Sequence, residues 1–374
     1  MKVEQIAWSD RDGWPQPAVL GDAQLVLIFG ARATLANTQL TSGAAERWPL
    51  AARIGCSTAG QIHGTAVFDD GAVATAVRFD HTRVRVATTT VTAAESASAG
   101  SSLGAQLAAP DLVHVLVISE GLDINGEALV RGLGETLSAS VSVSGGLSAD
   151  GEHFHETLVS VNGEARKNIV AAIGLYGDRL RVGCGSLGGW DPFGPERQIT
   201  KSEGNVLYEL DGQSALALYK RYLGDHAADL PASGLLFPLS LRRRDVSAPV
   251  VRTILSVNEA DQSLTFAGDV PVGGYVRLMK ANFDRLIDGA VGAGRVSTEA
   301  LGIPVDLALL ISCVGRRMVL RQRVEEEVEG VRDIVGPAAA ITGFYSYGEI
   351  SPFTPKARCE LHNQTMTVTT FSER

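Results

Sequence analysis

The sequence predicts an α/β protein of repeated strand-helix-strand-hairpin units, which form mixed β-sheets with flanking helices in two domains. The octet at 55–62 (GCSTAGQI) returns near the other end of the chain at 343–350 (GFYSYGEI), and both fit G-x-x-[ST]-x-G-[QE]-I. A weaker third copy, VSGGLSAD, lies at 143–150. Each copy follows an apolar run and a helix-like stretch, and a β-rich segment comes after it. One supersecondary unit used three times explains this order.

The spacing within the copies supports the same unit. From the middle of the apolar run to the first glycine the offsets are 27 residues (Ile28 to Gly55), 28 residues (Val117 to Gly145) and 32 residues (Ile311 to Gly343). These offsets are similar enough for one unit whose helix varies in length.

The first unit begins with a strand at 25–29, and we expect a helix from about 32 to 48. After the octet, β-rich runs at 72–79 and 84–90 are joined by Asp80-His-Thr-Arg83, which is typical of a hairpin.

In the second unit a surface helix is expected within 92–109, an Ala/Ser-rich stretch with two leucines. Asn125 can then cap a helix that carries leucines at 129, 133 and 137 on one face. The runs at 167–175 and 180–183 predict a second hairpin.

Residues 188–204 are dense in Gly, Pro and charge, which predicts a loop or linker. We place the domain boundary shortly after it, between a first domain at 20–210 and a second at 211–374.

The second domain should start with a helix at 214–223 that stops at Gly224, preceded by a strand at 205–210. The runs 250–257 and 264–267 predict a hairpin with a longer loop. The last unit then carries a helix with valines at 324, 328, 331 and 335. Its acidic run Glu325-Glu326-Glu327 is expected on the solvated face.

Composition predicts a soluble, globular chain in the cytoplasm. The 374 residues are 45% hydrophobic and 20% charged, and no apolar run approaches the roughly 18 residues that cross a bilayer. The first residues lack the order of a signal peptide. The cysteines at 56, 184, 313 and 359 are scattered without C-x-x-C pairs, which indicates reduced thiols.

The net charge of −9 disfavours binding to a phosphate backbone. The best basic run, Arg242-Arg243-Arg244, ends at Asp245 and is expected to be a solvated loop. We therefore expect no nucleic-acid partner and no membrane insertion.

Two motifs suggest chemistry that their context does not support. The run GCGSLG at 183–188 fits the dinucleotide fingerprint, but Gly189-Trp-Asp-Pro192 breaks the chain where the helix should begin. Cys56 or Ser57 could act as a nucleophile with His63 as base, yet the last copy has Phe344 and Tyr345 at these positions. The shared glycines favour a backbone role, either as a turn or as a pocket lined by N–H donors.

Histidines and cysteines offer only partial metal or haem sites. His153 and His155, or Cys359 and His362, would supply half a metal site each, and we assign no metal. His114 lies in the apolar run VHVLVI, where it is either a buried, hydrogen-bonded histidine or a haem ligand.

The predicted ligand-binding residues come from all three copies of the octet and their surroundings. They are Cys56, Ser57, Thr58 and Gly60 in the first, Gly145 and Gly146 in the second, and Cys313, Arg316, Tyr345, Tyr347, Glu349, His362 and Asn363 in the last. Several donors, aromatic rings and few charges suit small zwitterionic or amphiphilic ligands. No catalytic residue is assigned.

Five separated motifs, in order, give the chain a family resemblance. They are GCSTAGQI, GGW.PFGPER with SEGNVLYELDG after it, LISCVGRR, GFYSYGEISP and CELHNQTM. The chain resembles the FIST family, as FIST N and FIST C domains, from about Leu25 to the C-terminus. One departure is Gln61, where the family usually has Glu.

The resemblance implies a sensory input module for a small ligand, with amino acids as the proposed class. It implies bacterial partners such as histidine kinases or cyclic-di-nucleotide enzymes, and a stand-alone sensor, because no output domain is visible in the sequence. Some members resemble haem-based nitric oxide sensors, so haem is one alternative. An enzyme that uses Cys56 or Cys313 on a small metabolite is another.

Overall fold

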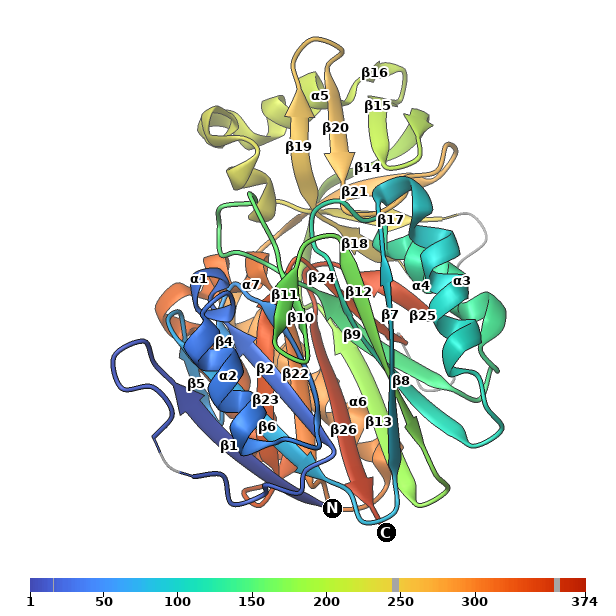
Figure 1. The fold of residues 1–374 in the computed structure, drawn as a ribbon. Coiled ribbons are helices and arrows are strands. Elements are labelled where there is room, and N and C mark those ends of the chain that lie inside the picture. The colour runs from blue at the N-terminus through green and yellow to red at the C-terminus, as the bar shows by residue number, and fades with distance from the viewer. Residues whose placement is uncertain (16, 244–248, 353–356) are drawn as a thin grey trace.

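Three six-stranded sheets with one strand order form the body of the molecule, and a fourth sheet forms a smaller inserted part (Figure 1). The computed structural model describes residues 1–15, 17–243, 249–352 and 357–374. Figure 1 shows the inserted part at one end of the body and both chain ends at the other. This α/β arrangement of repeated strand-helix-strand-hairpin units with mixed sheets confirms the predicted fold class.

The order of strands is the same in each sheet of the body. The first sheet runs β1 (Lys2–Trp8), β6 (Ala72–Arg78), β2 (Leu25–Gly30), β3 (Ala52–Ser57), β10 (Val159–Val161) and β11 (Glu164–Arg166). The second runs β7 (Arg83–Thr90), β12 (Ile169–Tyr176), β8 (Leu112–Ser119), β9 (Ser142–Leu147), β24 (Gly348–Pro352) and β25 (Cys359–His362). The third runs β13 (Leu180–Leu187), β26 (Met366–Glu373), β22 (Leu307–Cys313), β23 (Ala340–Ser346), β4 (Gln61–His63) and β5 (Ala66–Phe68).

A parallel pair stands at the centre of each sheet, and a glycine sits at the same register in all three. Gly55 pairs with Ile28 and Gly145 with Val117. Gly343 pairs with Leu310. A Cβ added at these glycines would lie 2.0, 2.0 and 1.8 Å from the carbonyl oxygen of the paired residue. The glycines are therefore required by the close approach of the two strands.

Each unit donates strands to the sheet of another unit. The short hairpin after the octet extends a neighbouring sheet: β4–β5 the third, β10–β11 the first and β24–β25 the second. The edge strands are exchanged too, since β7 pairs with β12 and β13 pairs with β26. The hairpins predicted at 72–90 and 167–183 are therefore wrong: the strands exist, but β6 and β7, and β12 and β13, lie in different sheets.

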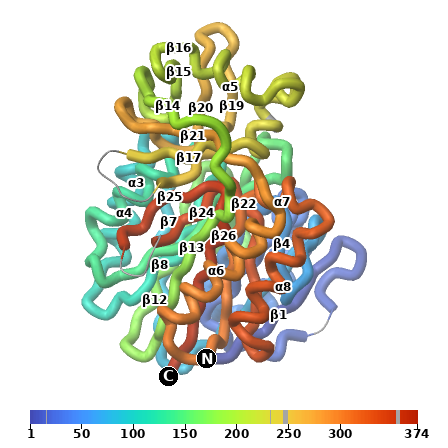
Figure 2. Tube along the Cα trace, turned by 180° about the vertical axis from the view of Figure 1, so that it is seen from behind, coloured from blue at the N-terminus to red at the C-terminus, as the bar shows by residue number. Residues whose placement is uncertain are grey.

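Helices cover the outer faces of the sheets. They are α1 (Arg32–Leu35), α2 (Thr38–Arg47), α3 (Ser96–Leu107), α4 (Gly126–Thr136), α6 (Phe283–Leu301), α7 (Val314–Leu320) and α8 (Val324–Val335). The predicted helix at 32–48 is divided because Asn37 caps α2 with a hydrogen bond from Gln39 N. As predicted, Asn125 caps α4, accepting from Ala128 N. Figure 2 shows α6 and α8 side by side on the third sheet.

The first two fingerprint-like glycines, Gly183 and Gly185, lie in β13, where they allow α6 to pack closely, and Gly188 follows the strand. A Cβ at Gly183 would lie 1.9 Å from the Ser297 carbonyl oxygen, and one at Gly185 would lie 2.2 Å from that of Ala293. Packing against a helix, not nucleotide binding, accounts for these glycines.

The inserted part lies between β13 and α6. Its strands are β14 (Asp191–Glu203), β15 (Val206–Leu210), β16 (Gln213–Ser214), β17 (Leu239–Arg242), β18 (Val250–Arg252), β19 (Ile254–Asn258), β20 (Ser263–Phe266) and β21 (Tyr275–Lys280), with helix α5 (Ala215–Leu223) and the 3-10 turns Gly224–Asp229 and Ala232–Leu235.

The linker predicted at 188–204 is wrong, since most of it is β14. Gly194 and Pro195 fall at a register break between Phe193 and Arg197, where missing ladder bonds are tolerated, whereas Pro192 lies opposite Met279 in the ladder. The predicted hairpin at 250–267 is present as β19 with β20.

The body has a central core where the inner faces of its three sheets meet. Phe29, Ile118 and Ile311 come from the three first strands of the parallel pairs, and all three are buried. The rings of Phe29 and Phe344 lie 4.7 Å apart. The inserted part has a separate core, built on Ile199, Leu216 and Phe266. The predicted division at residue 210 remains a prediction, and β14–β15 pair with β20–β21 across it.

No helix in the described ranges is long and apolar enough to cross a membrane.

Candidate functional site

Three main-chain hydrogen bonds close a ring where the octets meet. Ala59 N donates to Tyr345 O (2.9 Å), Tyr347 N donates to Leu147 O (3.3 Å) and Ala149 N donates to Ser57 O (2.9 Å). Each bond joins the residue four after the octet glycine to the residue two after the glycine of another unit. The three octets therefore meet around one pseudo-threefold axis, at the strand ends.

The first and third octets share a side-chain hydrogen bond at this place. Thr58 Oγ1 donates to Gln61 Oε1 (3.1 Å), and Ser346 Oγ donates to Glu349 Oε1 (2.8 Å). Gln61 Nε2 also donates to the carbonyl oxygens of Asp70 (2.7 Å) and Gly71 (3.2 Å). Gln61 and Glu349 thus have equivalent structural positions with different charge.

Glu349 is a buried carboxylate that forms no ion pair with any residue the structure describes. Its Oε2 accepts from Thr365 N (3.1 Å) and Thr365 Oγ1 (2.9 Å). Burial raises the pKa of Glu349 to about 8, although its hydrogen bonds and Arg316 act in the opposite direction. Near neutral pH this side chain can therefore hold or release a proton.

Two amide oxygens are buried without a partner in the described ranges, in the segment that directly precedes Thr365, the residue that bonds to Glu349. Asn363 Nδ2 donates weakly to Tyr347 O (3.5 Å), and its Oδ1 is unpaired. Gln364 Nε2 donates to Leu235 O (3.1 Å), and its Oε1 is unpaired. Both residues are fully buried. An unpaired buried acceptor is costly, so these oxygens suit a ligand that brings donors.

The same segment touches the inserted part. Trp190 Nε1 donates to Gln364 O (2.8 Å), and Leu235 belongs to the inserted part. Trp190 packs with Met279 and Leu286 in a small apolar cluster at the junction. The candidate site therefore lies where the octets, the β25–β26 loop and the inserted part come together.

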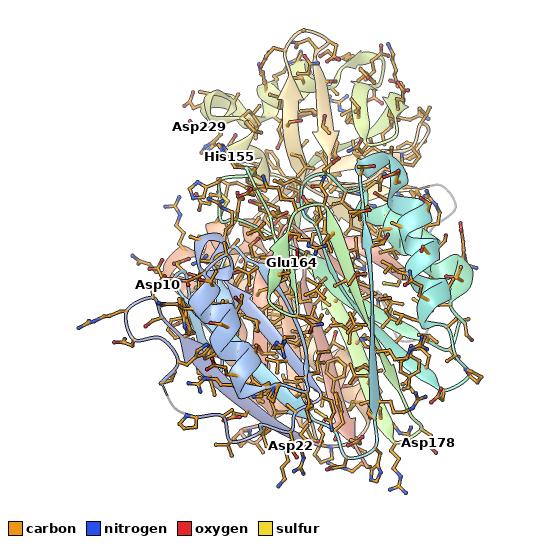
Figure 3. The ribbon with its side chains drawn as sticks, in the orientation of Figure 1. Asp10, Asp22, His155, Glu164, Asp178 and Asp229 are labelled. Atoms are coloured by element: carbon orange, nitrogen blue, oxygen red, sulfur yellow. The ribbon has the colours of Figure 1, made fainter. Side chains whose placement is uncertain are left out.

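Tyr347 anchors the long loop between β9 and β10. Its hydroxyl hydrogen-bonds to the Asp150 carboxylate and donates to Gly151 O (3.1 Å). Its ring stacks on Phe154, with centroids 4.4 Å apart. Burial raises the pKa of Asp150, but hydrogen bonds from Tyr347 and three backbone N–H groups hold it below its usual value. Figure 3 labels His155 in this loop.

Arg316 and Tyr345 belong to a neighbouring cluster around Glu327. Arg316 Nε and Nη2 donate to Glu327 Oε2 (3.0 and 2.6 Å), and Tyr345 Oη donates to Glu327 Oε1 (2.7 Å). Ser312 Oγ donates to the same oxygen as Tyr345 (3.0 Å). All of these side chains are buried. The prediction that Glu327 is solvated with the rest of its acidic run is wrong, because Arg316 compensates its charge inside the protein.

The basic run also differs from its prediction. Arg242 forms an ion pair with Glu196, and Arg243 bridges Glu127 and Glu360 between the inserted part and the body. Arg243 is therefore not part of a solvated loop, whereas Arg244 and Asp245 lie outside the described residues.

The predicted residues of the first and second octets are placed as follows. Cys56 is buried in the central core, and burial raises the pKa of its thiol well above the usual value. Ser57 Oγ accepts from Leu158 N (2.9 Å). Gly60 has a positive φ of 129° and leaves room for the Arg317 guanidinium, which hydrogen-bonds to Ala59 O. Gly146 lies opposite Glu349.

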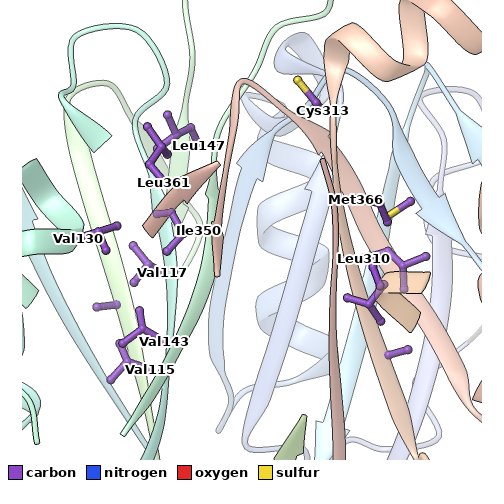
Figure 4. Packing of buried hydrophobic residues seen from close by; sticks show 14 of the residues in the cluster. Val115, Val117, Val130, Val143, Leu147, Leu310, Cys313, Ile350, Leu361 and Met366 are labelled. Carbon is purple, nitrogen blue, oxygen red and sulfur yellow. The ribbon is translucent and has the colours of Figure 1, made fainter. Parts of the chain in front are cut away.

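Cys313 is buried and belongs to the large apolar cluster of which Figure 4 shows a part. Burial and the nearby Glu349 raise the pKa of its thiol. Neither Cys313 nor Cys56 has the electropositive, partly exposed surroundings that activate a thiolate. The geometry does not support cysteine chemistry at either residue.

His114 and His362 do not provide a haem ligand. His114 Nδ1 bonds to Ser142 Oγ (2.7 Å) and Nε2 to Ser144 Oγ (3.1 Å), so both ring nitrogens are occupied. Burial lowers the pKa of His114 to about 3. His362 is also buried, with Nε2 bonded to Ser351 O (2.9 Å), and burial lowers its pKa to about 4. The residues present do not fit an axial haem ligand, and no described group of three or more His, Cys, Asp or Glu could hold a metal.

Sequence reasoning missed four residues of the site: Ser346, Gln364, Thr365 and Asp150. Ser346 could have been found from the sequence, because it occupies the [ST] position that the first and last octets share. Gln364 and Thr365 follow Asn363 directly, so the predicted cluster ended too early. Asp150 becomes visible only through its contact with Tyr347, which is 197 positions away.

The comparison with sequence families decides the relationship of this chain. The profile of the FIST N domain matches residues 24–213, and that of the FIST C domain matches residues 215–352. The chain belongs to the FIST family. In this FIST protein the three octets lie at the axis described above, and the inserted part crosses the junction of the two matched segments.

Other comparisons give more distant similarity. The FIST chain is 24% identical over 205 residues to an uncharacterized protein of Methanocaldococcus jannaschii, an alignment of 51% of this chain and 39% of that protein. The chain thus spans about two fifths of that relative. Two structures of cyanuric acid hydrolase, one from A. caulinodans, align over 100% of this chain and 99% of theirs at 10% identity, with TM-scores of 0.39 and 0.31.

Proposed function

We propose that this FIST protein is a sensory protein that binds a small ligand and acts on a separate signalling partner. The ligand site is centred on Glu349, Asn363 and Gln364, and the ligand carries a hydrogen-bond donor such as an amino group. An amino acid or a related metabolite meets this requirement. A histidine kinase or a cyclic-di-nucleotide enzyme is the proposed kind of partner, and the cytoplasm remains the predicted location.

One observation carries the proposal: buried acceptors are left without donors at the meeting point of the three units. Asn363 Oδ1 and Gln364 Oε1 are unpaired among the described residues, and Glu349 forms no ion pair with any of them. Most buried polar groups in proteins are paired. The two unpaired amide oxygens can each accept a hydrogen bond from an ammonium or amino group, and Glu349 supplies a titratable carboxyl group to the same region.

The site is also placed to report ligand binding. Gln364 holds the inserted part through Leu235 and Trp190. On the other side, Arg252 of the inserted part donates to Glu127 Oε2 (2.6 Å) and Leu361 O (3.1 Å). A ligand that forms a hydrogen bond with Gln364 changes the attachment at Gln364 and leaves the attachment at Arg252 unchanged. This difference favours a shift of the inserted part relative to the body.

The test is thermal stabilisation by a panel of amino acids and simple amines, with the wild-type chain, Glu349→Gln and Gln61→Leu. A ligand that binds only the folded state raises the Tm. We expect at least one amine-bearing compound to stabilise the wild type and Gln61→Leu alike. Glu349→Gln should lose that stabilisation.

Gln61→Leu is the matched control, because it removes the equivalent buried side chain in the first octet. Its Tm should fall without any change in the ligand-induced shift. Equal loss of the shift in both variants, or no stabilisation of the wild type by any compound, would contradict the proposal.

A further inference from the structure

The second octet lacks a polar partner that the other two octets possess. The register of the short hairpins identifies the equivalent positions. Gln61 of β4 lies opposite Phe344, Glu349 of β24 lies opposite Gly146, and Val159 of β10 lies opposite Cys56. Phe344, Gly146 and Cys56 each follow the octet glycine directly. Val159 therefore stands where the other units have Gln61 and Glu349.

The hydroxyl that should bond to this position is present. Ser148 is three residues after Gly145, as Thr58 is after Gly55 and Ser346 is after Gly343. The backbone agrees, since Ser148 N donates to Ser119 O (2.7 Å) as Thr58 N donates to Gly30 O (3.1 Å). Ser148 is fully buried, and its Oγ has no hydrogen-bond partner among the described residues.

We propose that Ser148 marks a ligand subsite for an uncharged amide group, which takes the place that the Gln61 carboxamide has in the first unit. In the first unit the amide oxygen accepts from a hydroxyl, and the amide nitrogen donates to two carbonyl oxygens of the 70–71 turn. The corresponding turn of the second unit is at 168–169, because Glu120 N donates to Ile169 O as Ala31 N donates to Gly71 O. Asn168 O and Ile169 O each accept one backbone hydrogen bond, from Val91 N and Glu120 N, as Gly71 O does from Ala31 N. A carbonyl oxygen has two lone pairs, so each of them can still accept from a ligand amide.

The surroundings select an uncharged group over a carboxylate. Glu120 follows Ser119 directly, and its carboxylate already accepts from Leu122 N (2.7 Å) and Asp123 N (3.2 Å). Asp150 lies two residues after Ser148. Its carboxylate likewise already accepts hydrogen bonds, from three backbone N–H groups at 154–156 and from the Tyr347 hydroxyl. A ligand carboxylate would be the third acidic group here, beside Glu120 and Asp150, neither of which forms an ion pair with a described residue, whereas an amide meets only hydrogen-bonding groups.

This subsite adjoins the proposed ligand site and rests on the proposed function. Tyr347 N donates to Leu147 O, next to Ser148, and Tyr347 O accepts from Asn363 Nδ2. One main-chain segment thus separates the unpaired Ser148 hydroxyl from the unpaired Asn363 oxygen. A ligand with an amino group at Glu349 and an amide at Ser148 would span the two places.

The experiment measures binding of acetamide, acetate and methylammonium to the full chain, by Tm and by chemical-shift perturbation at matched ionic strength. We expect acetamide to bind and acetate to bind more weakly. Ser148→Ala should weaken acetamide binding by about five- to tenfold, the loss expected for one hydrogen bond between neutral groups. Gln61→Leu should leave acetamide binding unchanged.

A second readout tests the unpaired hydroxyl without any ligand. Thr58→Val removes a hydroxyl that donates to Gln61, so its Tm should fall. Ser148→Ala removes a hydroxyl with no described partner, so its Tm should be unchanged or raised.

A fall in the Tm of Ser148→Ala as large as that of Thr58→Val would overturn the subsite. The subsite would also be overturned if Ser148→Ala did not weaken acetamide binding. That result would leave the proposed function standing if methylammonium still binds at Glu349. A different result would overturn the proposed amine site and leave the amide subsite in place. In that case neither methylammonium nor any amino compound would bind, while acetamide would bind to the wild type and not to Ser148→Ala.

Discussion

Glu349 accepts two hydrogen bonds from a single residue, Thr365, through its amide nitrogen and its hydroxyl. This pairing fixes the carboxylate without compensating its charge by a cation. The consequence is a folded-state pKa of about 8, raised above the ordinary value of 4.5 by burial.

The stability of the protein should therefore depend on the proton of Glu349. Below about pH 4.5 the group is protonated in both the folded and the unfolded state, and it contributes no difference. As the pH rises from there to about 8, the unfolded state loses the proton first, so the folded state loses about 1.4 kcal/mol of relative stability per pH unit. Denaturant unfolding of the wild type and Glu349→Gln at pH 5 and pH 8 measures this effect. The wild type should lose stability relative to the variant as the pH rises, and an unchanged difference would show that Glu349 is ionised in the folded protein throughout.

Removing Arg316 should destabilise the fold strongly. Glu327 would then keep a buried charge with only Ser312 and Tyr345 as donors. Breaking a buried ion pair in this way typically costs about 3–5 kcal/mol. The free energy of unfolding of Arg316→Met, Glu327→Gln and the double variant provides the measurement. The double variant should be less destabilised than the sum of the single changes, and simple additivity would contradict the coupling.

Alanine at the octet glycine of the last unit should be far more damaging than alanine at an exposed helical glycine. A Cβ at Gly343 would lie 1.8 Å from Leu310 O, and φ there is 159°. Gly134 in α4 has open space around its Cβ position. Gly134→Ala should raise stability by about 0.5–1 kcal/mol, because alanine is the better helix former. Gly343→Ala should fail to reach the native fold or unfold at a much lower denaturant concentration, and similar stabilities for the two variants would contradict the close strand approach.

The sequence predicted the unit and its glycines well because both are local. The offset from Ile28 to Gly55 and its two counterparts describe one strand, one helix and a second strand, which is the βαβ part of each unit. Period and spacing identify such elements without knowledge of the fold.

The pairing of strands after the octet could not be predicted in the same way. β6 and β7 are joined by a short turn, but they pair in different sheets, β6 with β2 and β7 with β12. A hairpin pattern records only the turn and the alternation of residues. Tertiary pairing decided the outcome.

The candidate site shows the same limit at the level of single residues. Tyr347, Glu349 and Asn363 were expected together because they lie near each other in the last unit. Arg316 was expected with them, yet it binds Glu327, a residue whose acidic neighbours suggested a solvated face. The unpaired Ser148 could be recognised only after the register of β10 showed Val159 in the equivalent place.

The exchange of strands also determines how the chain can be divided. A fragment that ends after β7 would contain the β4–β5 hairpin and β7, but β23, which pairs with β4, and β12, which pairs with β7, are encoded more than 70 residues further on. No third of the gene therefore specifies a self-sufficient folding module. A ribosome must complete almost the whole chain before the first sheet of the body and its two neighbours can all close, so the protein is expected to fold late in its synthesis and as one cooperative whole.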